Sequence, residues 1–398
     1  MEFYHDILEN LLDKLIDYRG KTPKKTLSGV PLVTAKIVKN GTINGYTEYI
    51  AEEDYDKWMV RGFPKVGDVI LTTEAPLGEV ALLKEEKVAL AQRIVCLRGK
   101  DNVLDNTYLK YYLQSGKGQK SLSARESGTT VTGIKQAELR RVDIEYPAYD
   151  DQRRIASILS SLDRKIELNN KINADLEEMA QAIFKNWFVD FEPFKDGKFV
   201  DSELGMIPEG WKVGTLGDIT KNKSAKVKER NDVKVLSPVT TGELVLSEEY
   251  FTKQVFSSSI AKYKIVNKGD FAYNPARVNI GSLGRNEFDF DGCVSPVYVV
   301  FSVLDGYENY FDLFRKTDFF KDSVASLAIG GVRQSLSYDD LSSIEVIIPS
   351  ENAVEEFNNL YNQMKKTIKA NKLENSRLSL LRDTLLPRLM SGELEVPE

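Results

Sequence analysis

The stretch DDQRRIASILSSLDRKIELNNKINADLEEMAQAIFKNWF, residues 150–188, repeats apolar side chains mostly at steps of three and four residues. Such steps place the side chains on one face of an α-helix and are typical of a coiled-coil seam. Asp150 or Asp151 can cap the start of this helix. One step is longer, and Asn169 lies in that gap. The predicted seam consists of Ile155, Leu159, Leu162, Ile166, Ile172, Leu176, Met179, Ile183 and Trp187.

A second long helix is predicted from about residue 352 to residue 390, opened by a capping box of Asn352 and Glu355. Because an exposed apolar seam needs a partner, we expect the two helices to pair in antiparallel orientation. Asn169 and Asn371 occupy matching places, and we expect them to meet and to fix the register of the pair. The second seam consists of Phe357, Leu360, Tyr361, Met364, Ile368, Leu373, Leu378, Leu381, Leu385 and Leu389.

The chain repeats itself at a constant offset of 202 residues. VDIEYP at residues 142–147 matches IEVIIP at residues 344–349, and KVGD at residues 65–68 matches NKGD at residues 267–270. Each copy begins with short alternating apolar runs separated by Gly, Pro and Asn, which indicate strands. A short helix and a final strand follow, before the long helix begins. The sequence therefore predicts two duplicated domains, because the repeat is too long for a solenoid.

The net charge of −6 argues against a nucleic-acid partner, but the charge is unevenly distributed. Three stretches are basic: residues 17–39 hold six Lys and Arg against one acid, residues 110–141 seven against two, and residues 212–234 seven against three. Local charge decides whether phosphates are attracted, so these stretches are candidates for DNA contact. Taken singly, each stretch is equally well explained as a solvated loop.

The rarer residues limit the chemistry. His5 is the only histidine, which excludes most Ser-His-Asp, Cys-His and His-ligated zinc sites. Cys96 and Cys293 lie alone in apolar runs, a pattern typical of a reduced, cytoplasmic protein without a metal cluster. No apolar run is long enough to span a membrane, and the charged start predicts no signal peptide.

No complete catalytic motif is present. SGKGQKS, residues 115–121, has the wrong spacing for a phosphate-binding loop, and YNPARV, residues 273–278, carries only the start of an adenine methyltransferase motif. Asp68, Glu85 and Lys87 could be forced into a metal-nuclease pattern, but that pattern is short and arises often by chance. We therefore expect no catalytic residues, no metal and no cofactor.

Four segments are specific enough to compare with a known family: residues 150–191, LLRDTLLPRLMSGELEV at residues 380–396, PEGWKVGTLGDI at residues 208–219 and DYRGKTPKK at residues 17–25. The first two resemble the central and distal conserved regions of the specificity subunits of type I restriction-modification systems. The other two are similar to the openings of their target-recognition domains. The first copy lacks the Pro-x-Gly-Trp entry, so we expect its first strand to be shortened or paired differently.

The resemblance implies an α+β fold: two similar α/β target-recognition domains joined by two long antiparallel coiled-coil helices, with an internal pseudo-twofold repeat. The expected boundaries are 1–149 for the first domain, 150–191 for the central helix, 192–350 for the second domain and 351–398 for the distal helix and tail. Members of the family are non-catalytic and read an asymmetric double-stranded DNA site in two halves. They dock two methyltransferase subunits, which in turn bind the nuclease/translocase subunits.

Candidate DNA contacts are Lys and Arg for phosphates, and polar side chains on rigid loops for bases. In the first copy the candidates are Arg19, Lys21, Lys24, Lys25, Thr72, Thr73, Glu74, Thr130 and Lys135. In the second copy they are Lys221, Lys223, Lys226, Asn274, Arg277, Asn279, Arg333 and Gln334. The offset pairs different residue types at these loops, as we expect for readers of two different half-sites.

An aromatic-rich segment, FKNWFVDFEPF at residues 184–194, ends the central helix. An exposed aromatic cluster is typical of a partner surface. We therefore predict that Trp187, Phe188, Phe191 and Phe194 dock a methyltransferase subunit. The alternative is that they cap the helix pair and pack on the second domain, which suits Trp187 best because it continues the seam.

Two other interpretations compete with a DNA reader. The chain could be a coiled-coil scaffold whose domains bind proteins without sequence-specific DNA binding. It could also be a single-chain nuclease or methyltransferase, which the missing motifs disfavour. The salt dependence of binding to mixed duplex DNA separates the scaffold from the reader, because phosphate neutralisation gives a steep slope.

Overall fold

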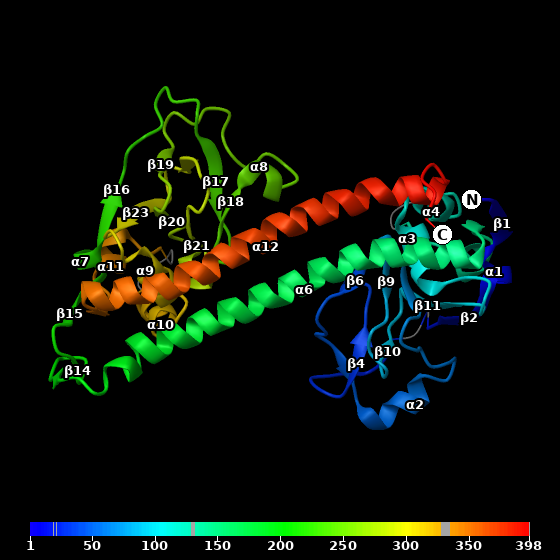
Figure 1. Cartoon of the computed structure of the whole chain (residues 1–398), viewed down its shortest axis with the longest axis horizontal. Coiled ribbons are helices and arrows are strands. Elements are labelled where there is room, and N and C mark those ends of the chain that lie inside the picture. Colours follow the sequence, from blue (N-terminus) through cyan, green and yellow to red (C-terminus); the bar gives the residue numbers. More distant parts are fainter. Residues whose placement is uncertain (19, 21, 129–131, 328–334, 398) are drawn as a thin grey trace. The chain divides into compact units, whose positions relative to one another are not determined.

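The computed structural model describes residues 1–18, 20, 22–128, 132–327 and 335–397. The chain forms two units: unit 1 is Met1–Lys171 with Asn371–Glu398, and unit 2 is Ile172–Ala370. Two long helices, α6 (Tyr149–Phe188, 40 residues) and α12 (Glu351–Ser391, 41 residues), each give one half to either unit (Figure 1). The two long helices predicted from the sequence are therefore confirmed.

Unit 1 carries its strands and short helices on the two half-helices. Its elements are β1 (Phe3–Ile7), α1 (Leu8–Leu11), β2 (Leu12–Asp17), β3 (Lys25–Thr26), β4 (Val30–Val33), β5 (Val38–Lys39), β6 (Thr42–Ile43), β7 (Tyr49–Ile50), η1 (Glu52–Asp54), α2 (Tyr55–Trp58), β8 (Val69–Thr73), β9 (Leu77–Leu82), β10 (Ala89–Leu90), β11 (Ile94–Gly99), α3 (Asn106–Gln114), α4 (Gly116–Ser123), α5 (Gln136–Arg140) and β12 (Asp143–Pro147). An antiparallel sheet has the order β2-β11-β8-β9, and a mixed sheet has the order β10-β4-β7-β3.

Unit 2 repeats this plan. Its elements are η2 (Glu192–Phe194), β13 (Phe199–Val200), β14 (Ile207–Pro208), β15 (Lys212–Thr215), α7 (Leu216–Ile219), β16 (Thr220–Lys223), β17 (Lys234–Pro238), β18 (Leu244–Leu246), α8 (Ser247–Tyr250), β19 (Lys264–Val266), β20 (Phe271–Tyr273), η3 (Val278–Ile280), β21 (Leu283–Arg285), β22 (Gly292–Val294), β23 (Val299–Val303), α9 (Glu308–Phe314), α10 (Asp318–Leu327), α11 (Tyr338–Ser342) and β24 (Glu345–Ile348). The sheet β16-β23-β20-β21 matches β2-β11-β8-β9 in order and in its antiparallel pairing, and β18-β17-β22-β19 is the second sheet. The duplicated α+β fold is thereby confirmed.

The turns before β8 and β20 show how closely the two copies agree. In each, a carboxylate accepts a hydrogen bond from a backbone N–H three residues earlier: Lys65 donates to Asp68 at 2.7 Å, and Asn267 donates to Asp270 at 2.9 Å. Gly67 and Gly269 adopt left-handed φ values of 86° and 89°, which only glycine adopts without cost. The matching motifs KVGD and NKGD are therefore turn signals rather than catalytic ones.

The entry strand of the first copy is neither shortened nor paired differently. β1 pairs antiparallel with β12 from Phe3 opposite Pro147 to Ile7 opposite Asp143, and β15 pairs in the same way with β24. β1 has five residues and β15 has four. The expectation drawn from the missing Pro-x-Gly-Trp was wrong, because strand pairing depends on the backbone and does not need that motif.

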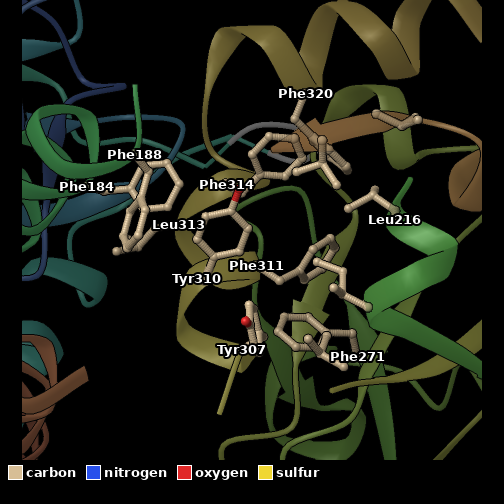
Figure 2. Close-up of a cluster of buried hydrophobic side chains, with 14 of the residues drawn as sticks. Phe184, Phe188, Leu216, Phe271, Tyr307, Tyr310, Phe311, Leu313, Phe314 and Phe320 are labelled. Atoms are coloured by element: carbon tan, nitrogen blue, oxygen red, sulfur yellow. The ribbon is translucent and has the colours of Figure 1, made fainter. Parts of the chain in front are cut away.

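The core of unit 2 is aromatic, and the second half of α6 contributes to it. Figure 2 shows Phe184 and Phe188 facing Tyr310 of α9, with ring centroids 5.5 Å and 5.1 Å from that of Tyr310. Phe311 and Phe271 continue the cluster toward the sheet, with centroids 4.9 Å apart. Edge and tilted ring contacts of this kind add to the free energy gained by burial. The end of α6 is therefore anchored in the core of unit 2.

The seam of α6 differs from the predicted one in its second half. Buried and half-buried residues do recur at steps of three and four, but Ile172 and Met179 are exposed. The observed seam continues through Asn169, Asn173, Leu176 and Ala180. The prediction chose Ile172 and Met179 because they are larger and more apolar than their neighbours Asn173 and Ala180. The helix geometry instead keeps the alternating steps of three and four residues along the seam.

The seam of α12 shows the same correction. Phe357, Tyr361, Met364, Ile368, Leu378, Leu385 and Leu389 are buried or half-buried, as predicted. Leu360, Leu373 and Leu381 are exposed. Polar residues occupy seam positions in their place, and in unit 1 these include Asn375 and Arg382. The helix pair therefore has a partly polar contact near its middle.

Asn169 meets a partner one turn away from the predicted one. Its Nδ2 donates to Glu374 Oε2 at 2.8 Å and to Asn375 Oδ1 at 2.9 Å. Asn375 in turn donates to Asn170 at 2.8 Å, and Arg382 donates to Asp163 at 2.9 Å. Successive residues of α6 thus contact residues of α12 with decreasing residue numbers, which confirms the antiparallel pairing within unit 1. The predicted Asn169–Asn371 contact was one turn out of register.

Replacing Leu159 by alanine should destabilise unit 1 by about 2–5 kcal/mol, because Leu159 is fully buried and its loss leaves a cavity. Replacing Leu373, which is 54% exposed, should cost within about 0.5 kcal/mol. Denaturant unfolding of the two variants and the parent measures both values. Equal losses would contradict the assignment of seam and surface positions on the two helices.

Candidate nucleic-acid interface

The connection that follows β8 in unit 1 and β20 in unit 2 differs clearly in length between the units. In unit 1, β8 ends at Thr73 and β9 begins at Leu77. In unit 2, β20 ends at Tyr273 and β21 begins only at Leu283. The longer connection exposes Arg277, Asn279 and Ile280. Unit 2 therefore presents an additional polar loop, residues 274–282, which we call the 274–282 loop.

Hydrogen bonds hold the 274–282 loop in one conformation. The Arg277 N–H donates to the Asn274 carbonyl at 2.9 Å, and the Ser282 N–H donates to the Arg277 carbonyl at 3.1 Å. The Ser282 hydroxyl, which is buried, donates to the Pro238 carbonyl at 2.8 Å. A loop fixed in this way presents side chains at defined positions, as base recognition requires.

A second turn, between β17 and β18, supports the 274–282 loop. Gly281 has a left-handed φ of 94°, and a Cβ there would lie 2.7 Å from the Thr240 carbonyl oxygen. Arg315, which is nearly buried, donates to the Gly242 carbonyl at 3.0 Å and to the Leu283 carbonyl at 2.9 Å. Thr240 and Thr241 are exposed beside the loop. The sequence analysis missed these residues, although the turn signal Thr-Thr-Gly was visible.

A distant segment returns to the same place in both units. In unit 1 the Ile134 N–H donates to the Thr73 carbonyl at 2.9 Å, and in unit 2 the Leu336 N–H donates to the Pro275 carbonyl at 3.1 Å. Both bonds join residues related by the offset of 202. In unit 1 this contact brings the exposed Lys135 near the turn after β8. The predicted candidates Arg19, Lys21, Thr130, Arg333 and Gln334 lie outside the described residues.

Thr72 and Thr73 cannot contact a ligand where they stand, because both side chains are buried in β8. β8 lies between β11 and β9, and core residues cover both of its faces. The Thr72 hydroxyl accepts a hydrogen bond from the Glu79 N–H at 2.9 Å. Of this predicted group only Glu74 is accessible, and it forms an ion pair with Arg93 at 2.8 Å. Both threonine side chains therefore lie in the core of unit 1.

The predicted basic residues of the opening loops are mostly exposed. Lys24, Lys221 and Lys226 face solvent, whereas Lys25 pairs with Glu48 at 2.7 Å. Lys223 pairs with the buried Asp270 at 2.7 Å, so its charge is already balanced within the unit. Burial raises the pKa of Asp270, while Lys223 acts in the opposite direction. Lys223 is therefore a weaker candidate for phosphate contact than its two neighbours.

The residues of the rejected metal-nuclease pattern serve other contacts. Asp68 is bound by Arg98 through two hydrogen bonds of 2.7 and 2.8 Å, and Lys87 forms an ion pair with Glu52. Within the described parts of the chain, no group of three or more His, Cys, Asp or Glu could hold a metal ion. No helix in those parts has the length and apolar character needed to cross a membrane.

Comparisons with known proteins agree with this geometry. A family model described as a type I restriction modification DNA specificity domain matches residues 13–178. The MjaIX specificity subunit of Methanocaldococcus jannaschii is 29% identical over 399 residues, covering 95% of this chain and 91% of that one. The HindI specificity subunit of Haemophilus influenzae is 26% identical over 357 residues, covering 69% and 74%.

A solved structure has the same fold. The type I restriction-modification S subunit from M. genitalium matches 100% of this chain and 97% of its own, with a TM-score of 0.60 and 17% identity. Sequence and fold similarity thus extend over the whole chain. The chain is similar in sequence to the specificity subunits of type I restriction enzymes.

The aromatic segment, residues 184–194, packs on unit 2. Phe188 is 4% exposed and belongs to the core of unit 2. Trp187, Phe191 and Phe194 are half-buried, and the rings of Phe191 and Phe194 lie 5.5 Å and 5.0 Å from that of Trp211. The structure favours the alternative, a cap of the helix pair, because Trp211 of the Pro-x-Gly-Trp entry covers these rings. Phe188 offers no surface to a partner.

Replacing Gly281 by alanine should destabilise unit 2 more than replacing Gly306 by alanine. Both glycines have left-handed φ, which costs an alanine about 1–2 kcal/mol. Only at Gly281 would the new Cβ collide with a backbone oxygen, whereas nothing lies within 4 Å at Gly306. Denaturant midpoints of G281A and G306A provide the comparison. Equal midpoints would mean that the 274–282 loop is free to move away from Thr240.

Proposed function

We propose that this chain gives a type I restriction-modification complex its DNA sequence specificity. Unit 1 binds one half of an asymmetric double-stranded site and unit 2 binds the other. The chain itself is non-catalytic, and it docks two methyltransferase subunits in the cytoplasm, through which nuclease/translocase subunits join the complex. The observation that carries this proposal is the rigid, exposed 274–282 loop on a duplicated framework whose other copy has a different turn.

The chemistry of the loop suits a DNA partner. Arg277 and Asn279 are exposed, and among the described residues no carboxylate forms an ion pair with Arg277. Arg pairs with guanine and Asn with adenine through two hydrogen bonds each, or either binds phosphate. The framework around the loop consists of backbone bonds that repeat in both units, so loops can diverge without loss of the fold. Two different readers on one frame fit a site with two different halves.

The helices supply candidate docking positions for two methyltransferase subunits. Met179 on α6 in unit 2 and Leu381 on α12 in unit 1 are related by the offset of 202, and they are 52% and 46% exposed. Each lies one residue off the seam, so it is not needed for the pairing of the helices. Exposed apolar side chains at equivalent positions fit two copies of one partner. This surface replaces the aromatic segment as the best docking candidate.

An R277A variant should bind its DNA site roughly ten- to a hundred-fold more weakly, because one positioned guanidinium is lost. The matched variant R277K keeps the charge but loses the planar fork. If Arg277 reads a base, R277K should be as weak as R277A; if it binds phosphate, R277K should recover most of the affinity. Binding curves at several salt concentrations measure this. Mapping of methylated sites should show a change in one half of the motif only.

If R277A bound duplex DNA like the parent with an unchanged salt slope, the 274–282 loop would not be a DNA contact. If the parent showed no steep salt dependence and no sequence preference, the coiled-coil scaffold would be the better interpretation. Changes in both halves of the methylated motif at once would contradict one reader per unit.

Replacing either Met179 or Leu381 by aspartate should remove one of the two methyltransferase subunits, because a charge would then be buried in an apolar contact. The double variant should bind none. L27D, which changes a fully exposed leucine of a unit 1 loop, is the control. Light scattering of the purified complexes counts the subunits. Two methyltransferase subunits on the M179D/L381D double variant would exclude these positions as the docking surface.

A further inference from the structure

Unit 2 buries an ion pair at the end of α9, next to the 274–282 loop. The side chains of Arg315 and Asp312 are 9% and 7% exposed, and Arg315 donates to Asp312 Oδ1 from Nε at 3.0 Å and from Nη2 at 2.7 Å. Burial alone would raise the pKa of Asp312, but the positive charges around it, that of Arg315 first, lower it to about 2. A buried ion pair adds little net stability, because both ions lose their hydration. Stability alone therefore does not explain the pair.

Arg315 also joins two separate segments of unit 2. Its Nη1 donates to the Leu283 carbonyl at 2.9 Å, directly after the 274–282 loop, and its Nη2 donates to the Gly242 carbonyl at 3.0 Å, between β17 and β18. We call residues 239–243 the 239–243 turn. A guanidinium is planar and bonds several acceptors at once in fixed directions. Arg315 therefore holds the 239–243 turn and the 274–282 loop in a fixed position relative to each other.

The 239–243 turn exposes two hydroxyl side chains beside the 274–282 loop. Thr240 and Thr241 are exposed, and the Thr241 hydroxyl donates to Glu243 Oε2 at 3.3 Å. The two segments are in close contact, because a Cβ at Gly281 would lie only 2.7 Å from the Thr240 carbonyl oxygen. Threonine hydroxyls bond both phosphates and base edges. The turn therefore adds two polar groups to those that the 274–282 loop exposes, Arg277 and Asn279.

The first turn of α9 is fixed to the part of α12 that belongs to unit 2. The buried Asn309 donates from Nδ2 to Asn358 Oδ1 at 2.9 Å and to Asn362 Oδ1 at 3.0 Å. Its Oδ1 accepts a hydrogen bond from Arg285 at 2.9 Å. Arg285 ends β21, whereas Leu283, which Arg315 binds, begins it. α9 is therefore bonded to α12 and to both ends of β21, so Arg315 is itself held in place.

Unit 1 has a leucine, Leu113, where the offset of 202 places Arg315. Leu113 is fully buried, and the connection after β8 is short. Thr73 and Leu77 face each other in the register of β8 and β9, so the strands themselves hold that turn. A loop as long as residues 274–282 has no such support from strand pairing at its tip. The buried arginine thus occurs in the unit whose loop needs support from elsewhere.

We propose that Arg315 is a positioning residue for DNA recognition, which holds the 239–243 turn against the 274–282 loop so that Thr240 and Thr241 complete the reading surface of unit 2. This inference rests on the proposed function and deepens it, because two segments instead of one loop then read the half-site. Arg315 is buried and does not touch DNA itself. Asp312 fixes the direction of its guanidinium, and the two threonines bond phosphates or base edges.

The test is a double-mutant cycle on the DNA affinity of the full chain, with the duplex that the parent chain selects from a random pool as the probe. R315K keeps the charge beside Asp312, but an ammonium lacks the planar fork that binds two carbonyls at once. R315K and T240A/T241A should each weaken binding roughly ten-fold. Added to T240A/T241A, R315K should cost at most about two-fold more, because the groups that it positions are already gone. R388K, an Arg-to-Lys change in an exposed ion pair of unit 1, is the control and should bind like the parent.

Equal losses from R315K in both backgrounds would overturn the inference, and so would parent-like binding by R315K or by T240A/T241A. The salt slope of R315K should equal that of the parent, and a slope reduced by about one would mean that Arg315 contacts a phosphate directly.

If R315K does not fold, T240A/T241A decides the question, because it changes exposed residues only. It must then lose affinity and alter the selected bases in one half of the site, and failure to do so overturns the inference. A parent chain that selects no sequence from the pool would contradict the proposed function and this inference together. A parent that selects a site, with losses that simply add, would overturn this inference alone.

Discussion

The burial of both long helices in both units is the constraint on which the fold depends. Ile155 and Leu159 of α6 and Leu389 and Met390 of α12 belong to one buried cluster of unit 1. Phe184, Phe188, Phe357 and Tyr361 do the same in unit 2. Since unit 1 takes residues from both ends of the chain, its core is complete only when α12 has been added. The ion pair between the Met1 amino group and Glu395, at 2.8 Å, closes the same unit where the two termini meet (Figure 1).

A seam that was apolar throughout would hold the helices more strongly but would specify their register less well. In unit 1 the seam instead contains Asn169, Asn375 and Arg382, each with a partner on the other helix. A shift by one turn would leave these groups unpaired in a buried place, which costs more than an apolar mismatch. The polar seam positions therefore trade stability for a single register. The short helices α3 and α9 dock on the long helices through the Lys110–Asp163 and Asn309–Asn358 contacts.

The duplication, the long helices and the class of protein could be predicted from the sequence, because each rests on a pattern that extends over many residues. The offset of 202 appears again in paired backbone bonds, such as Ile134 to Thr73 and Leu336 to Pro275. The finer seam assignments failed at Ile172, Met179, Leu360, Leu373 and Leu381, because an apolar residue one position off the seam was preferred to a polar residue on it. Hydropathy alone does not show whether a seam position is occupied by an asparagine with a hydrogen-bond partner or by a neighbouring leucine, because it takes no account of partners on the other helix.

Two of the predicted DNA contacts lie in the core of unit 1, for a related reason. Thr72 and Thr73 carry the right chemistry for a DNA contact, but they precede the turn and lie in a central strand. Whether a polar residue near a strand end is buried depends on where the strand stops, and sequence places such boundaries only within a few residues. Phe188 and Phe191 were predicted to form a partner surface because Trp211, whose ring packs on both, lies well after them in the sequence although it is close in the fold. Burial by a distant segment leaves no local signal.

The features that the two copies share differ in their physical character from the features in which the copies diverge. The shared features are closed hydrogen bonds: the aspartate turns before β8 and β20, the entry strands and the returning segments. Losing any one of them would leave buried polar groups without partners, so they resist change in both copies. The features that differ are the exposed loops and the sign of the buried charge at Lys110 and Asp312. A loop can change alone, whereas a buried charge can change only together with the group that pairs with it, which is Asp163 of α6 for Lys110 and Arg315 of the same unit for Asp312.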